Sequence, residues 1–134
     1  MDKFEFLDTK PFAAASIGQV HLGQLKNSPE KLAIKIQYPG VAQSIQSDID
    51  NLMSILNVAQ LLPKGMYAEN VVKVLKVELL DECDYIREAQ CMLKFAELLK
   101  NDTVFVVPKV NMELSTNNIL GNLIKTSPFS FDSI

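Results

Sequence analysis

Lys35 stands where its amine could do chemistry, in the middle of a segment with strand periodicity. In residues 31–38 the aliphatic side chains alternate with smaller or polar ones, so Leu32, Ile34 and Ile36 face one side. Lys35 then faces the other side, two residues after the small side chain of Ala33. This placement predicts an amine that points into a ligand cleft, although an ordinary solvent-facing lysine fits the same pattern.

Glu82 occupies a slot in an apolar helical stripe. Residues 69–100 have the periodicity of one long helix, with apolar residues three and four positions apart. The next position of this stripe, between Leu79 and Ile86, is occupied by Glu82. At about 100° of rotation per residue, Glu88 points well away from the stripe.

An inward carboxylate is costly unless it is paired. Lys35 from the neighbouring strand is the natural partner of Glu82, and we expect an ion pair between them. The alternative is a helix break between Asp81 and Asp84, which would leave Glu82 exposed. The sequence pattern leaves both open.

A third candidate is the alanine-rich loop of residues 11–20, which leads into the strands. Ala13, Ala14 and Ala15 precede Ser16. Because alanine strongly disfavours positive φ, this backbone should not wrap phosphates as a glycine loop does. Taken alone, the three alanines are also typical of a helix start or a buried turn.

The surrounding elements predict an α+β domain. We expect an antiparallel hairpin of residues 16–26 and 31–38, a helix over 41–62 and the long helix over 69–100. A strand over 103–108 follows, and the chain continues into a further strand over 109–114. The last segment, 121–134, lacks a clear period and is expected to be an irregular tail.

Composition limits the function classes. The chain has 134 residues, 48% hydrophobic residues and a net charge of −3, which fits one domain with a core and makes nucleic acid an improbable partner. A single histidine, His21, makes a histidine-rich metal site improbable, and Cys83 and Cys91 match no zinc or redox spacing. No apolar run approaches a membrane span, and the first residues resemble no signal or transit sequence.

Three segments together resemble a known family. Leu32-Ala33-Ile34-Lys35 is similar to the V-A-I-K signature, whose lysine pairs with nucleotide phosphates and with a helix glutamate. With the flanking segments 11–21, 33–41 and 82–89, it resembles the UbiB/AarF atypical kinase-like family, and most closely the mitochondrial branch that supports coenzyme Q (ubiquinone) biosynthesis. The resemblance covers about Phe4 to Leu120.

The resemblance implies a protein-kinase-like fold with nucleotide binding and ATPase-type activity. This chain would be a partial N-terminal lobe over residues 1–120, followed by the divergent tail over 121–134. The resemblance implies nucleotide-binding positions in the alanine-rich loop, the lysine strand and the helix: Ala13, Ala14, Ala15, Ser16, Ala33, Lys35 and Glu82. The helix over 41–62 would be a family-specific insertion.

Several family features are missing from this sequence. No lysine precedes x-Gly-Gln, no asparagine has an aspartate five positions earlier, and no glycine has one two positions earlier. The general base and both magnesium-ligand motifs of kinases are therefore not found. We expect no catalytic or metal-binding residue here, and the abrupt loss of resemblance after Leu120 suggests a truncated sequence.

Two functions follow as expectations. The first is a fragment of an atypical kinase or ATPase whose full-length form binds ATP or ADP with Mg, with weak or no nucleotide binding by this chain alone. The partners of the full-length form would be coenzyme Q biosynthesis proteins and inner-membrane lipid. By the same resemblance, its location would be mitochondrial. The alternative is a non-catalytic module that docks on a protein complex or a membrane surface through an exposed apolar face.

Overall fold

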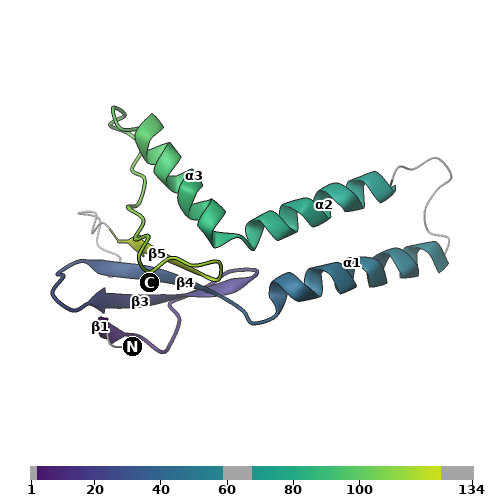
Figure 1. Ribbon diagram of the computed structural model, residues 1–134, viewed down its shortest axis with the longest axis horizontal. Coiled ribbons are helices and arrows are strands. Elements are labelled where there is room, and N and C mark those ends of the chain that lie inside the picture. Colours follow the sequence, from purple (N-terminus) through teal and green to yellow (C-terminus); the bar gives the residue numbers. More distant parts are fainter. Residues whose placement is uncertain (1–2, 59–67, 125–134) are drawn as a thin grey trace.

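The computed structural model describes residues 3–58 and 68–124 as a sheet with three helices. In Figure 1 the antiparallel sheet forms one layer, and α3 (Tyr85–Leu98) lies over one of its faces. The helices α1 (Val41–Val58) and α2 (Ala68–Glu82) run side by side beyond one end of the sheet. This arrangement confirms the predicted α+β class.

Within the described residues five strands form the sheet, and all of their pairings are antiparallel. The strand order is β1-β3-β4-β5, and β2 pairs with the remaining part of β3. The bounds are β1 Phe4–Leu7, β2 Ala13–Ala14, β3 Gly18–Leu25, β4 Lys31–Gln37 and β5 Ile119–Leu123.

The predicted hairpin is confirmed as β3 and β4. Its turn contains Asn27 with a φ of 65°, a left-handed conformation that asparagine tolerates better than most residues. In the register of the sheet, Lys35 lies between Val20 of β3 and Leu120 of β5. A central strand flanked on both sides holds the backbone of Lys35 rigidly beneath α3.

The helices are α1 (Val41–Val58), α2 (Ala68–Glu82) and α3 (Tyr85–Leu98). The predicted helix over 41–62 is confirmed from Val41 to Val58, and its last expected residues, 59–62, lie outside the described residues. The prediction of one helix over 69–100 is wrong, because the chain breaks after Glu82 and α3 starts afresh at Tyr85.

Two small apolar clusters make up much of the core between the sheet and the helices. One contains Tyr85, Ala89, Val110 and Leu120, and joins α3 to β5. The other joins α1 to the end of α2 through Ile45, Ile49 and Cys83. Ile17, just before β3, packs against both clusters and so connects the start of the hairpin to all three helices.

The segment after α3 differs from its prediction. Residues 103–108 form no strand, and Val104, Phe105 and Val106 are exposed, so their apolar character does not mark a core strand here. Instead β5 pairs with the free edge of β4 and crosses the boundary that we placed after Leu120. The rest of the expected tail, residues 125–134, lies outside the described residues.

Within residues 3–58 and 68–124, none of the helices has the length and hydropathy that a membrane crossing requires.

Candidate functional site

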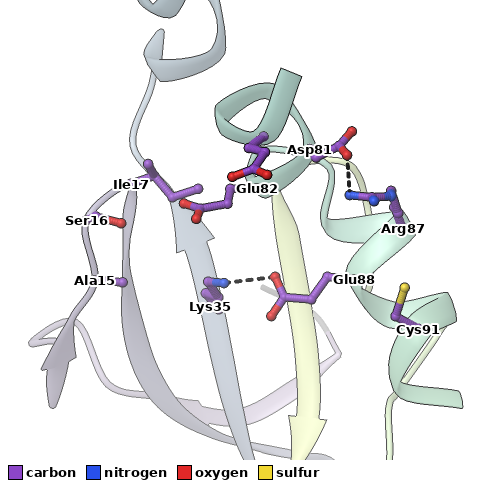
Figure 2. A pocket seen from close by; sticks show the side chains of 10 residues that line it. Ala15, Ser16, Ile17, Lys35, Asp81, Glu82, Arg87, Glu88 and Cys91 are labelled. Atoms are coloured by element: carbon purple, nitrogen blue, oxygen red, sulfur yellow. Dashed lines mark hydrogen bonds and ion pairs between the residues drawn. The ribbon is translucent and has the colours of Figure 1, made fainter. Parts of the chain in front are cut away.

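A cleft of about 620 Å³ opens between the alanine-rich loop, β4 and the junction of α2 with α3. Figure 2 shows the loop residues on one side of Lys35 and the α3 residues on the other. The cleft is lined by Ala15, Ser16, Ile17, Lys35, Glu78, Asp81, Glu82, Arg87, Glu88 and Cys91.

Lys35 forms an ion pair with Glu88 across the floor of this cleft. Its Nζ atom donates a hydrogen bond of 2.9 Å to Glu88 Oε2, and the two side chains are 25% and 40% exposed. A strand lysine is thereby joined to a helix glutamate 53 residues later in the chain. An ammonium group held in this way can donate a further hydrogen bond to a phosphate oxygen.

The predicted partner of Lys35, Glu82, is the wrong residue. Glu82 is the last residue of α2 and is exposed, and Figure 2 shows Glu88 rather than Glu82 across from Lys35. The alternative of a helix break near residues 81–84 is therefore correct. Because the break resets the helical phase, counting 100° per residue through it gave the wrong face for both glutamates.

Several contacts fix the break between α2 and α3. Asp84 is the N-cap of α3, and its carboxylate accepts a hydrogen bond of 3.0 Å from the backbone N–H of Arg87. Arg87 also forms a 2.8 Å ion pair with Asp81 of α2 across the break. From β4, the buried Gln37 donates a hydrogen bond of 2.9 Å to the Cys83 carbonyl oxygen. Together these contacts set the direction of α3 and hence the position of Glu88.

The alanine-rich loop folds as a small hairpin rather than as a helix start or a buried turn. Ala13 and Ala14 form β2 opposite Val20 and Gln19 of β3, and both alanines are exposed. The turn is closed by a 2.8 Å hydrogen bond from the Ala15 backbone N–H to the Gly18 carbonyl oxygen. Among the described residues, the only non-glycine with positive φ is Asn27, so no alanine of this loop is strained.

The cleft brings together four of the seven predicted binding residues. Ala15, Ser16, Lys35 and Glu82 line it. Ala13 and Ala14 lie on the neighbouring edge strand, and Ala33 lies two residues from Lys35 on the same face of β4, in register with Leu22 and Asn122. These three residues are next to the cleft without lining it.

Sequence reasoning missed Glu88 and Tyr85. The buried side of α3 contains Tyr85, Ala89 and the partly buried Met92, whereas the predicted stripe entered this segment at Ile86, one position later than Tyr85. One signal could have found it, because Asp84 is a strong N-cap residue and predicts a new helix from Tyr85.

Two groups at the junction have shifted acidities. Burial, and to a smaller extent the charges of Glu88 and Cys83, raises the pKa of Tyr85 to about 12. Burial and the nearby charge of Glu82 raise the pKa of the Cys83 thiol above its usual value. Both side chains therefore remain neutral at physiological pH.

The charges around the cleft suit a cationic or Mg-bound ligand better than a bare anion. Four carboxylates, from Glu78, Asp81, Glu82 and Glu88, line it against the two cations Lys35 and Arg87. Both cations are already paired with carboxylates. Within the described residues, however, no group of three His, Cys, Asp or Glu side chains is arranged to hold a metal ion.

An antiparallel sheet whose central strand presents a lysine to a helix glutamate is the N-terminal lobe of a kinase-like protein. The family model of the ABC1 atypical kinase-like domain matches residues 1–122 of this sequence. The chain therefore belongs to the ABC1 atypical kinase-like family, which confirms the UbiB/AarF resemblance noted from its motifs.

Relatives with this domain are much longer than this chain. The sequence is 55% identical over 119 residues to the mitochondrial atypical kinase COQ8B of Danio rerio, covering 89% of this chain and 19% of that protein. It is 48% identical over 118 residues to the mitochondrial atypical kinase COQ8 of Saccharomyces cerevisiae, covering 88% and 23%. The chain thus spans about a fifth of the curated relatives that it matches.

A solved structure supports the same fold. The structure of Rv3197 in complex with erythromycin, from Mycobacterium tuberculosis, matches with a TM-score of 0.73 and 29% sequence identity. The match covers 92% of this chain and 31% of that one. This chain thus shares the fold of about a third of that larger protein.

Proposed function

We propose that this chain is the nucleotide-binding part of a UbiB-type atypical kinase or ATPase that supports ubiquinone biosynthesis in mitochondria. The observation that supports it most is the Lys35–Glu88 ion pair of 2.9 Å on the floor of the cleft. In kinase-type sites such a pair orients the lysine toward the nucleotide phosphates. The turn from Ala15 to Ile17 forms the opposite wall, where a phosphate-covering loop is needed.

The expected cofactor is ATP or ADP with Mg. Lys35 would contact the phosphates, and the exposed hydroxyl of Ser16 would donate a further hydrogen bond. The sequence contains neither the aspartate–glycine nor the aspartate–asparagine spacing that holds Mg in kinases. Binding by this chain alone is therefore weak, and phosphoryl transfer needs residues that the sequence does not contain.

A second function, docking on a protein complex or a membrane surface, is favoured by the exposed apolar side chains of α2. Val71, Val74 and Leu75 surround a shallow hollow on this helix. A docking module should be a soluble species that unfolds cooperatively, whereas an incomplete lobe should aggregate or melt over a broad temperature range.

Protection of a cysteine in the cleft tests the nucleotide site. Cys91 is exposed and lines the cleft, while Cys83 is buried beside it and serves as an internal reference. With millimolar Mg-ATP we expect the reaction of Cys91 with a thiol reagent to slow in a saturable way, and that of Cys83 to stay unchanged. Saturation at micromolar nucleotide would contradict weak binding, and no protection of Cys91 would contradict the site.

Two variants of one strand provide the matched control. Lys35→Met removes the amine in the cleft, and Lys31→Met removes an exposed amine from the first position of the same strand. Protection of Cys91 should be lost in Lys35→Met and retained in Lys31→Met. Equal protection in both variants would show that nucleotide does not bind through Lys35.

A further inference from the structure

The Lys35 ammonium has a second contact besides Glu88. Its Nζ atom lies 4.5 Å from the centroid of the Tyr85 ring, within the range of a cation–π interaction. Tyr85 and Glu88 are three residues apart on α3, so they lie on the same side of the helix. One turn of α3 therefore offers the ammonium an aromatic face and a carboxylate at once.

We propose that Tyr85 is a positioning residue that aims the Lys35 amine into the cleft. This inference rests on the proposed function, because the cleft is the nucleotide site only if that proposal holds. The ring face and the Glu88 carboxylate act as two fixed points for one flexible side chain.

The ion pair alone is a weak restraint. Glu88 is 40% exposed, and ion pairs between partly exposed side chains gain little over their hydrated forms. A lysine also has four rotatable bonds, so a single contact leaves many conformations. A partly desolvated cation–π contact favours the conformer of Lys35 whose amine lies over the Tyr85 ring by about two- to thirtyfold, which is enough to select it.

The core, and not the hydroxyl group, holds the Tyr85 ring in place. Tyr85 is fully buried and packs with Ala89, Val110 and Leu120, and the partly buried Ile17 packs against this cluster. Its hydroxyl is buried without a hydrogen-bond partner in the part of the chain that is described. The ring is therefore the part that acts on Lys35, and Phe at this position should replace it.

Ile17 connects the Tyr85 cluster to the alanine-rich loop. It contacts the cluster around Tyr85 and also lines the cleft. A Cβ atom added at Gly18 would lie 3.0 Å from the Tyr85 hydroxyl oxygen, which shows how closely the strand start approaches the ring. The Tyr85 cluster thus contacts both the loop that should cover a phosphate, through Ile17, and the amine that should contact it, through the ring.

The first experiment measures how freely the Lys35 amine reacts in this chain without nucleotide. Each lysine is acetylated with an N-hydroxysuccinimide ester, and the rates are read by mass spectrometry relative to Lys31, which is exposed on the same strand. In Tyr85→Phe we expect the Lys35 to Lys31 ratio to stay within about twofold of the parent. In Tyr85→Leu we expect it to rise by about two- to thirtyfold.

The second experiment keeps the shape of the ring and changes only its charge distribution. Phenylalanines with increasing numbers of ring fluorines at position 85 weaken the negative face of the ring in steps while preserving its packing. The Lys35 to Lys31 ratio should rise with each step, at unchanged thermal stability. This series keeps the proposal testable if Tyr85→Leu does not fold.

Constant reactivity of Lys35 across the fluorinated series would overturn the proposal, as would a Tyr85→Phe variant whose ratio rises as much as that of Tyr85→Leu. Because no nucleotide is present, these results do not depend on nucleotide binding. Failure of nucleotide to protect Cys91 would instead overturn the proposed function and leave the contact between Tyr85 and Lys35 established.

Discussion

Gln37, the last residue of β4, donates a 2.9 Å hydrogen bond to the carbonyl oxygen of Cys83, in the break between α2 and α3. Its own side-chain oxygen accepts a 2.6 Å hydrogen bond from the amide of Asn118, just before β5. One buried amide therefore joins the lysine strand, the helix break and the edge strand. The direction of α3, and with it the position of Glu88, depends on this junction.

Replacing Gln37 should destabilise the fold. In Gln37→Leu the buried carbonyl of Cys83 loses its donor, so we expect the free energy of unfolding to fall by about 1–3 kcal/mol in urea denaturation. Gln46→Leu, on the exposed side of α1, should change it by less than about 0.5 kcal/mol. Equal effects of the two substitutions would show that the Gln37 junction adds no stability.

Zero-length crosslinking should identify the carboxylate that contacts Lys35. A carbodiimide joins amines to carboxylates in direct contact, and we expect it to couple Lys35 to Glu88. Glu88→Gln should abolish this product, whereas Glu82→Gln should leave it unchanged. Because the ion pair is partly exposed, Glu88→Gln should lower the free energy of unfolding by less than about 1 kcal/mol. A dominant product between Lys35 and Glu82 would contradict the structure.

The start of β3 has no room for a side chain. A Cβ at Gly18 would lie 2.5 Å from the backbone oxygen of Ile36, which cannot move without disturbing the sheet. Gly18→Ala should therefore destabilise the fold by about 1–3 kcal/mol. At Gly23, on the same strand, the nearest atom is the flexible end of Ile34 at 2.9 Å, so Gly23→Ala should cost less. Thermal unfolding of both variants tests this order.

Alkaline pH should destabilise the chain through Tyr85. Its pKa is raised to about 12 by burial in the folded state, while the unfolded chain loses the same proton near the ordinary value. The unfolded state therefore binds fewer protons as the pH rises through this window, and the stability contributed by Tyr85 is progressively lost, on the order of 2 kcal/mol in total.

Phenolate absorbance measures this transition. Tyr85→Phe should reduce the slope of the unfolding free energy between about pH 10 and 12, and should remove one phenolate from the alkaline absorbance titration. A parent chain whose tyrosines all ionise near the ordinary tyrosine pKa would contradict the buried position of Tyr85.

The sequence by itself determined the hairpin and the face of β4 on which Lys35 lies. Alternation is local, because every second side chain of a strand faces the same way, so the apolar row of β4 already placed Lys35 on the opposite face. The motifs around it also identified the family, which the match over residues 1–122 confirms. Nucleotide binding by any of the seven predicted residues stays a prediction.

Only the tertiary structure decided which glutamate meets Lys35 and which segment completes the sheet. A break of two residues after Glu82 rotates the rest of the helical stripe, and this break is held by Gln37 from a distant strand. Likewise, residues 119–123 form a strand because they pair with the edge of β4. The more apolar segment 103–108 has no such pairing and forms no strand. Local periodicity cannot predict the glutamate that meets Lys35 or the strand that completes the sheet, because both depend on contacts between segments far apart in the chain.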